Sequence, residues 1–123
     1  MARLLIIDKE ASVCQMLEIA FRRDGHVVES VSTGQAGREK IESGVYDVII
    51  SDIRMPDISG IELLQAARSV KPRAAFILMT AVPTVDTAIQ AVNLSAYRYV
   101  IKRDSLVRDL RTAVEDALRE KPS

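Results

Sequence analysis

Short apolar segments alternate with longer amphipathic segments along the whole chain. Five apolar runs are bounded by polar or turn-forming residues, which predicts five buried β-strands. Between these runs, apolar side chains recur every three or four residues, as on one face of a helix. Strand and helix therefore alternate, and this order is typical of an α/β protein with a parallel sheet. The predicted strands cover residues 3–7, 27–31, 47–52, 75–80 and 97–101.

The predicted helices differ in how clearly an apolar face is marked. Gly25 is expected to end the first helix in a left-handed conformation. A helix near residues 35–43 has only a weak apolar pattern. The faces predicted to be buried are Val13, Met16, Leu17, Ala20 and Phe21 in the first helix, Val85, Ala88, Ile89 and Val92 in the fourth, and Val107, Leu110, Val114 and Ala117 in the last.

Polar side chains stand where four of the strands end. The third strand ends on Asp52, and a turn marked by Pro56 and Gly60 follows at once. Taken alone, a strand-terminal aspartate is more commonly a helix cap or a solvated turn residue. However, the carboxyl ends of parallel strands share one edge of the sheet, where ligands bind, so these groups are expected to converge and Asp52 is a candidate nucleophile. The other polar strand ends are Asp8, Thr80 and Lys102.

Composition limits the class of protein. The 123 residues, 48% of them hydrophobic, are enough for a single domain with its own core, and we take residues 1–123 as that domain. Seventeen basic and 17 acidic side chains cancel, so no direct binding to nucleic acid or to a membrane surface is expected. No apolar run approaches the roughly 18 residues of a membrane span. No signal pattern opens the chain, and we expect a cytoplasmic protein.

Three further side chains carry weaker signals. Cys14 is the only cysteine, which excludes a disulfide within the chain, and it is interpreted as a small core or boundary residue. His26 lies at the entrance to a strand, far in sequence from the polar strand ends, and is interpreted as structural. Asp57 lies in the turn after Asp52 and is interpreted as supporting that turn, without a catalytic role.

Three motifs occur in order at the strand ends: DIRMPDISG at residues 52–60, MTA at 79–81 and YRYVIK at 97–102. With them the chain resembles, over its whole length, the response-regulator receiver domain, the phospho-aspartate module of two-component signalling. This resemblance implies a flavodoxin-like fold, a doubly wound five-stranded parallel sheet of order 2-1-3-4-5 with five helices. The alternation of strand and helix alone does not yield that order.

The resemblance also implies roles for single residues. Asp52 falls on the phosphoacceptor, Thr80 on the switch hydroxyl, Tyr99 on the switch aromatic and Lys102 on the lysine of the family's site. The implied chemistry is transfer of a phosphoryl group from a phosphohistidine to Asp52, as part of a phosphorelay. The chain would catalyse its own phosphorylation and dephosphorylation without being a turnover enzyme.

The implied cofactor is Mg²⁺. By the same resemblance its ligands would be Asp8, Asp52 and the backbone carbonyl of Arg54, with Glu10 as a further ligand. Lys9, however, stands where the family places a second acidic residue, so that two carboxylates face two lysines and Mg²⁺ binding is expected to be weakened. Three arrangements of Lys9 are then open. Its side chain swings outward while Glu10 helps to hold a weakly bound metal, or its ammonium takes the cation position and pairs with Asp52. In the third arrangement Lys9 is merely solvated.

Two other positions depart from the family pattern. Arg103 replaces a proline that forms a cis peptide bond after the lysine, so we expect a trans bond and a displaced loop that shifts Lys102 relative to Asp52. Ser95 replaces a glycine that precedes the aromatic segment.

The resemblance implies partners as well. A sensor histidine kinase or a phosphotransfer protein would supply the phosphoryl group, and an output domain or a target protein would receive the signal. The responding surface would be the fourth helix, the fifth strand and the fifth helix, which is also the expected surface of a homodimer.

Three alternatives stand beside this interpretation. The first is a phosphatase resembling the haloacid-dehalogenase group, because Asp8 and Glu10 have the spacing of that group's nucleophile and partner acid. The chain, however, has no later acidic pair to hold the metal and no cap to select a substrate. In a flavin-binding relative of the fold, the same two carboxylates would repel the phosphate. A pseudo-receiver would keep the fold as a docking or dimerisation module that no longer responds to phosphate.

Overall fold

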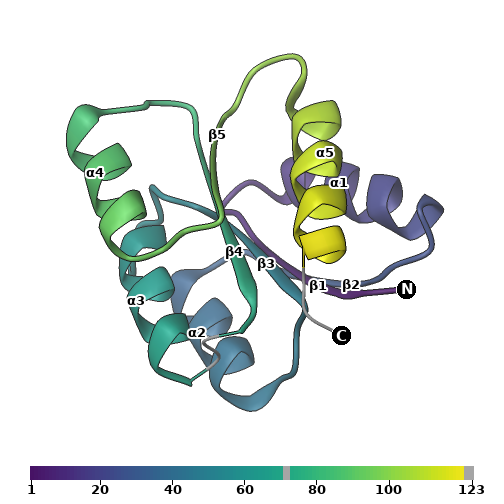
Figure 1. The fold of residues 1–123 in the computed structure, drawn as a ribbon, viewed down its shortest axis with the longest axis horizontal. Helices are drawn as coiled ribbons and strands as arrows, with labels where there is room; N and C mark the ends of the chain where they lie inside the picture. Colours follow the sequence, from purple (N-terminus) through teal and green to yellow (C-terminus); the bar gives the residue numbers. More distant parts are fainter. Residues whose placement is uncertain (71–72, 121–123) are drawn as a thin grey trace.

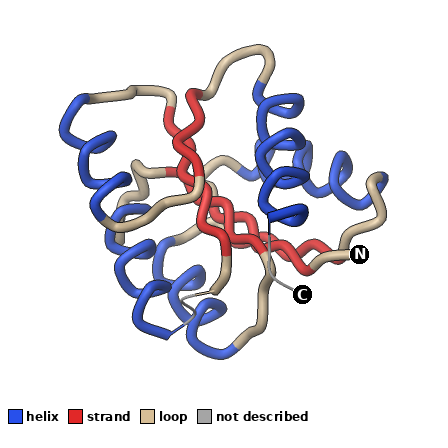
Figure 2. Tube along the Cα trace, viewed as in Figure 1, coloured by secondary structure: helices blue, strands red, loops and turns tan. Residues whose placement is uncertain are grey.

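The computed structural model describes residues 1–70 and 73–120, and within them it confirms the predicted architecture (Figures 1 and 2). Five parallel strands form one sheet in the order β2-β1-β3-β4-β5. The strands are β1 (Arg3–Ile7), β2 (Val27–Val31), β3 (Val48–Asp52), β4 (Ala75–Thr80) and β5 (Arg98–Ile101). The helices are α1 (Ala11–Arg23), α2 (Gly34–Ser43), α3 (Gly60–Val70), α4 (Val85–Asn93) and α5 (Leu106–Glu120).

Helices cover both faces of the sheet, with α1 and α5 on one side and α2, α3 and α4 on the other (Figure 1). Alternate side chains of β1 enter the two cores: Leu4 and Ile6 pack on the α1–α5 side, whereas Leu5 and Ile7 pack on the α2–α3 side. All four side chains are fully buried. Because a central strand of such a sheet is covered on both faces, its sequence reads as a continuous apolar run.

Most of the predicted local features are confirmed. The strand predictions are off only at the first residue of β3 and of β5, each of which begins one residue later. The weakly patterned segment is the helix α2, and Gly25 follows α1 with a φ of +90°. Cys14 is buried in the core, and the Nδ1 atom of His26 accepts a hydrogen bond from the backbone N–H of Ala2 at 3.1 Å. His26 therefore has a structural contact, as expected.

The buried face predicted for α4 is wrong. Val85, Ile89 and Val92 are 75%, 52% and 77% exposed, and the buried residue of this helix is Ala91. The small Ala91 side chain packs with the α2–α3 core, so the larger apolar stripe of α4 faces solvent. Met16 in α1, also expected inside, is exposed as well. Periodicity identifies an apolar stripe but does not say what covers it.

The strand register places the polar strand ends at one level. Asp52 pairs with Met79, one residue before Thr80, and Thr80 pairs with Ile101, one residue before Lys102. Asp8 follows directly after β1, which runs beside β3. No described helix is long and apolar enough to span a membrane.

Candidate functional site

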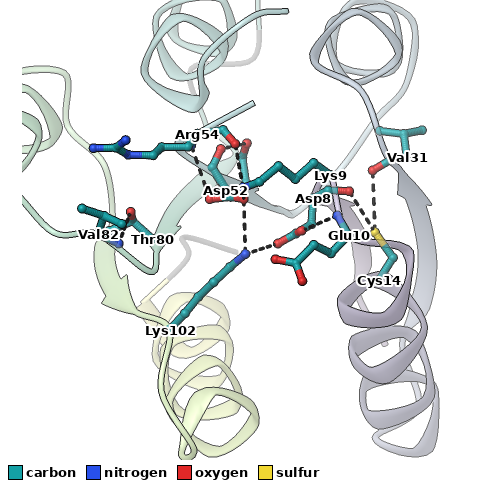
Figure 3. Close-up of polar contacts among 11 residues, drawn as sticks. Asp8, Lys9, Glu10, Cys14, Val31, Asp52, Arg54, Thr80, Val82 and Lys102 are labelled. Atoms are coloured by element: carbon teal, nitrogen blue, oxygen red, sulfur yellow. Dashed lines mark hydrogen bonds and ion pairs between the residues drawn. The ribbon is translucent and has the colours of Figure 1, made fainter. Parts of the chain in front are cut away.

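A cluster of charged side chains lies at the carboxyl ends of β1, β3 and β5 (Figure 3). Asp8, Asp52 and Thr80 are almost completely buried, although all three are polar. Lys102 reaches into the cluster from the end of β5, with only 11% of its side chain exposed. The structure therefore brings together the four polar strand ends that the sequence predicts.

Lys102 connects the two buried aspartates. Its Nζ donates to Asp8 Oδ2 at 2.6 Å and to Asp52 Oδ2 at 3.2 Å. Burial of the ammonium lowers the pKa of Lys102, but the hydrogen bond to Asp8 and the charges of Asp8 and Asp52 outweigh burial and leave this pKa above its ordinary value. Lys102 is therefore a permanent positive charge between two carboxylates.

Lys9 contributes a second ammonium to the same carboxylate. Its Nζ donates to Asp52 Oδ2 at 2.8 Å and to the backbone carbonyl of Arg54 at 2.9 Å. Of the three arrangements considered for Lys9, the ion pair with Asp52 is the one present (Figure 3). The exposed Glu10 donates its backbone N–H to Asp8 Oδ1 at 2.8 Å, which orients the Asp8 carboxylate.

The turn after Asp52 closes tightly over the end of β3. The Gly60 N–H donates to the carbonyl of Ile53 at 2.9 Å, and the Arg54 N–H approaches Asp52 Oδ1 at 3.4 Å. A Cβ atom at Gly60 would lie 2.3 Å from the Asp52 carbonyl oxygen, so only glycine fits there. The turn thus holds Asp52 and the Arg54 carbonyl in fixed positions.

Asp57 has a wider role than support of its own turn. Its carboxylate accepts the backbone N–H groups of Gly34 at 2.9 Å and Gln35 at 2.8 Å, at the start of α2. These hydrogen bonds from Gln35 and Gly34 hold the pKa of Asp57 below its ordinary value. The Thr33 hydroxyl accepts the next N–H, that of Ala36, at 3.1 Å. Asp57 and Thr33 together cap α2.

The two residues expected to switch lie on neighbouring strands. The Thr80 hydroxyl oxygen accepts the backbone N–H of Val82 at 3.1 Å. Tyr99 is half-buried, and its hydroxyl lies 2.8 Å from the Thr87 hydroxyl and accepts the Thr84 N–H at 3.3 Å. Sequence reasoning missed Thr84 and Thr87 as partners of Tyr99, although Thr84, directly before α4, is a capping signal.

The departures at Arg103 and Ser95 have distinct structural outcomes. The described residues contain no cis peptide bond, so the Lys102–Arg103 bond is trans, as expected. Arg103 Nε pairs with Asp109 Oδ2 at 3.3 Å at the start of α5, while Lys102 stays within hydrogen-bond distance of Asp52. Ser95 adopts a φ of +62°, in the left-handed region that favours glycine.

The donor set does not fit Mg²⁺ as it is arranged. Oxygens of Asp8, Asp52 and Arg54, the expected ligands, already accept hydrogen bonds from ammonium groups. The two buried carboxylates are balanced by Lys9 and Lys102, which removes the negative charge that attracts a divalent cation. Among the described residues, no group of three or more His, Cys, Asp or Glu side chains could hold a metal.

A buried aspartate at a strand end, paired with a lysine from β5 on a sheet of this order, defines a site of the receiver type. A family model described as the response regulator receiver domain matches residues 4–115, and the chain belongs to this family. It is a receiver domain of two-component response regulators. Receiver domains of transcriptional regulators are not turnover enzymes, and the matches do not favour the phosphatase or flavin-binding alternatives.

The curated relatives are much longer than this chain. The regulatory protein AtoC of Escherichia coli is 38% identical over 117 residues, which cover 95% of this chain and 25% of AtoC. The response regulator protein PilR of Pseudomonas aeruginosa is 33% identical, with 95% of this chain and 26% of PilR covered. The chain thus spans about a quarter of the length of these relatives.

Solved receiver structures have the same fold. A CheY-like receiver domain protein from Methanospirillum hungatei superposes with a TM-score of 0.94 at 27% identity, covering 98% of this chain and 96% of that one. The response regulator TrrA from Thermotoga maritima, solved in complex with Mg²⁺ and BeF, has a TM-score of 0.85 at 30% identity, covering 95% and 99%. The beryllofluoride-activated NtrC4 receiver domain dimer has a TM-score of 0.87 at 28% identity, covering 98% of both chains.

Proposed function

We propose that Asp52 accepts a phosphoryl group from the phosphohistidine of a sensor histidine kinase or a phosphotransfer protein. The observation that carries this proposal is the double ammonium contact: Lys9 and Lys102 lie 2.8 Å and 3.2 Å from Asp52 Oδ2. Among the described residues, the other oxygen, Oδ1, has only the longer contact of 3.4 Å with the Arg54 N–H, and it is the more available nucleophile. A bond would form between this oxygen and phosphorus while the phosphorus–nitrogen bond breaks and the imidazole nitrogen keeps the electron pair.

The charges around Asp52 suit this transfer. The incoming phosphoryl group brings negative charge to a buried position, and two ammonium groups are already oriented toward it. At an effective dielectric constant near 20, a pair of unit charges ~4 Å apart attracts by about 4 kcal/mol. The Thr80 hydroxyl uses its oxygen to accept the Val82 N–H, so its own hydrogen can be donated to a phosphoryl oxygen.

Weak binding of Mg²⁺ is part of the same proposal. TrrA, a neighbour at 30% identity, was solved with Mg²⁺ and BeF, whereas here Lys9 contacts two of the oxygens expected to bind the metal. We therefore assign no step of the transfer to a divalent cation. Residues 1–123 would act as one receiver that catalyses its own phosphorylation and dephosphorylation.

The proposed response runs from Asp52 through Thr80 to Tyr99. Phosphorylation would draw the Thr80 hydroxyl inward and open space behind it, and the half-buried Tyr99 would move into that space. The hydroxyl of Tyr99 is hydrogen-bonded to residues at the start of α4, so movement of the tyrosine would change this helix first. The signal would appear on the surface formed by α4, β5 and α5.

A second copy of the chain is the proposed partner of that surface. Three large apolar side chains of α4 are exposed, and Ile101 on β5 is exposed as well. The related NtrC4 receiver domain is a dimer in its beryllofluoride-activated form. Since AtoC and PilR are about four times as long as this chain, we also propose an output domain or a separate target protein as the receiver of the signal.

Phosphorylation by a small phosphodonor tests the proposal. Incubation with phosphoramidate should add one phosphoryl group to the protein, seen in the intact mass, and the group should be stable to acid and labile to base. Asp52→Asn should abolish labelling, whereas Asp57→Asn, in the same turn, should retain it. An unchanged mass with every donor and metal would make the chain a pseudo-receiver.

A further inference from the structure

We propose that the Lys9 ammonium is a built-in cation that excludes Mg²⁺ from this site, so that phosphorylation of Asp52 requires no divalent metal. The second half of this inference rests on the proposed function of Asp52. The first half concerns only the ground state of the site and can be tested without phosphorylation.

The contacts of Lys9 are those of a site-bound cation. One Nζ atom binds a carboxylate oxygen of Asp52 at 2.8 Å and the Arg54 carbonyl oxygen at 2.9 Å (Figure 3). Mg²⁺ would need the same two oxygens at about 2.0–2.1 Å, together with octahedral geometry and retained waters. An ammonium and a divalent cation cannot share these oxygens, so binding of one removes the other.

The fold directs Lys9 to this position. Asp8, the preceding residue, is fully buried, and its backbone N–H donates to the carbonyl of Val31 at 3.2 Å. This hydrogen bond to β2, together with the pairing of β1 and β3, fixes the point at which the backbone of Lys9 leaves β1. Its side chain is 43% exposed, but its ammonium lies on a carboxylate that is 2% exposed. The partly exposed side chain thus brings its charge to a buried carboxylate oxygen.

The charge of the cluster explains both halves of the inference. With Lys9 and Lys102 opposite Asp8 and Asp52, the four groups sum to zero, so little attraction for a divalent cation remains. Phosphorylation would replace the single charge of Asp52 by a phosphoryl group with nearly two negative charges. Two ammonium groups then face that group, which supplies the neutralisation that a metal supplies elsewhere.

Magnesium titration tests the exclusion directly. In NMR spectra, the amide signals of Asp8, Asp52 and Arg54 should shift in Lys9→Asp at MgCl₂ concentrations at least tenfold lower than those needed to shift them in the wild type. Lys9→Met removes the ammonium without adding a carboxylate and should bind with intermediate affinity. Lys40→Asp is the matched control, because Lys40 is similarly exposed at 47% and pairs with Glu29 outside the site. Wild type that saturates at the same Mg²⁺ concentration as Lys9→Asp would overturn the inference.

Labelling with phosphoramidate tests the metal requirement. Wild-type protein should gain its phosphoryl group at the same rate, within twofold, in EDTA and in MgCl₂. Lys9→Asp should lose at least tenfold in rate when EDTA replaces MgCl₂. A wild-type protein that is labelled only with MgCl₂, or that stays unlabelled while Lys9→Asp is labelled, refutes the metal-independent reaction. If every variant stays unlabelled, the proposed function of Asp52 fails, and the titration alone decides whether Lys9 excludes the metal.

Discussion

The Tyr99 hydroxyl lies 2.8 Å from the Thr87 hydroxyl, which joins β5 to the first turn of α4. The same phenol oxygen accepts the N–H of Thr84, the residue whose hydroxyl caps this helix by accepting the Thr87 N–H at 3.1 Å. The position of the tyrosine and the start of α4 therefore depend on each other.

Removal of the Tyr99 hydroxyl should loosen the start of α4. Tyr99→Phe keeps the ring but leaves the Thr84 N–H without this acceptor, so the free energy of unfolding should fall by about 1 kcal/mol. Urea unfolding measures this change, and NMR should place the largest amide shifts at Thr84 and Thr87. Tyr97→Phe is the control, because the Tyr97 hydroxyl donates a hydrogen bond to the exposed Glu120. This variant should change the free energy of unfolding by less than ~0.5 kcal/mol. An unshifted Thr84 amide in Tyr99→Phe would contradict the coupling.

The exposed stripe of α4 should mediate self-association of the activated protein. Val92→Lys places a charge on a side chain that is 77% exposed, so the monomer should keep its stability within about 0.5 kcal/mol. The beryllofluoride-treated variant should dimerise at least tenfold more weakly than the wild type, as measured by analytical ultracentrifugation. Ile19→Lys, on the exposed side of α1, should leave dimerisation unchanged. A wild type that stays monomeric after treatment would contradict self-association through this stripe.

Substitution of Gly60 should disturb the site through a steric clash. In Gly60→Ala the new methyl group would meet the Asp52 carbonyl oxygen at 2.3 Å, so the turn must shift, and the free energy of unfolding should fall by about 1–3 kcal/mol. Gly25→Ala offers a comparison, because the space there is open but φ is +90°, and the cost should be about 1 kcal/mol. Only Gly60→Ala should also shift the Asp52 amide signal. Equal spectral changes in both variants would mean that Gly60 does not hold the turn.

Asp57 should make stability depend on pH in the acid range. The hydrogen bonds from Gln35 and Gly34 lower its pKa from 3.8, so its charged form stabilises the folded protein fully above pH 3.8, and this contribution is lost as pH falls through the lowered pKa. Asp57→Asn should therefore lower the melting temperature at neutral pH, and the difference from wild type should shrink below pH 3.8. Thermal melts over this range measure the effect, and a difference that grows toward low pH would exclude the capping role.

Relief of the left-handed conformation at Ser95 should stabilise the protein. A non-glycine residue at a φ of +62° pays a steric cost, and glycine removes it while adding some backbone entropy to the unfolded chain. Ser95→Gly should raise the free energy of unfolding by about 0.5–1 kcal/mol. Ser95→Ala keeps the Cβ atom and should bring no such gain, which urea unfolding of the three proteins can establish.

The sequence by itself determined the type and order of the elements and the residues that end the strands. The spacing of apolar residues and the length of apolar runs distinguish buried strands from amphipathic helices, because each type of element has its own local backbone geometry. Polar residues that close apolar runs must then meet at one edge of a parallel sheet, which is why Asp8, Asp52, Thr80 and Lys102 could be identified together.

Only the tertiary structure decided which partners these residues have. Lys9 and the Arg54 carbonyl are 45 residues apart, and Asp57 caps a helix that begins 23 residues earlier in the chain. Likewise, the apolar stripe of α4 has the spacing of a buried face, but the small Ala91 meets the core and the stripe stays exposed. These outcomes depend on which segments the fold brings into contact, and no local pattern encodes that.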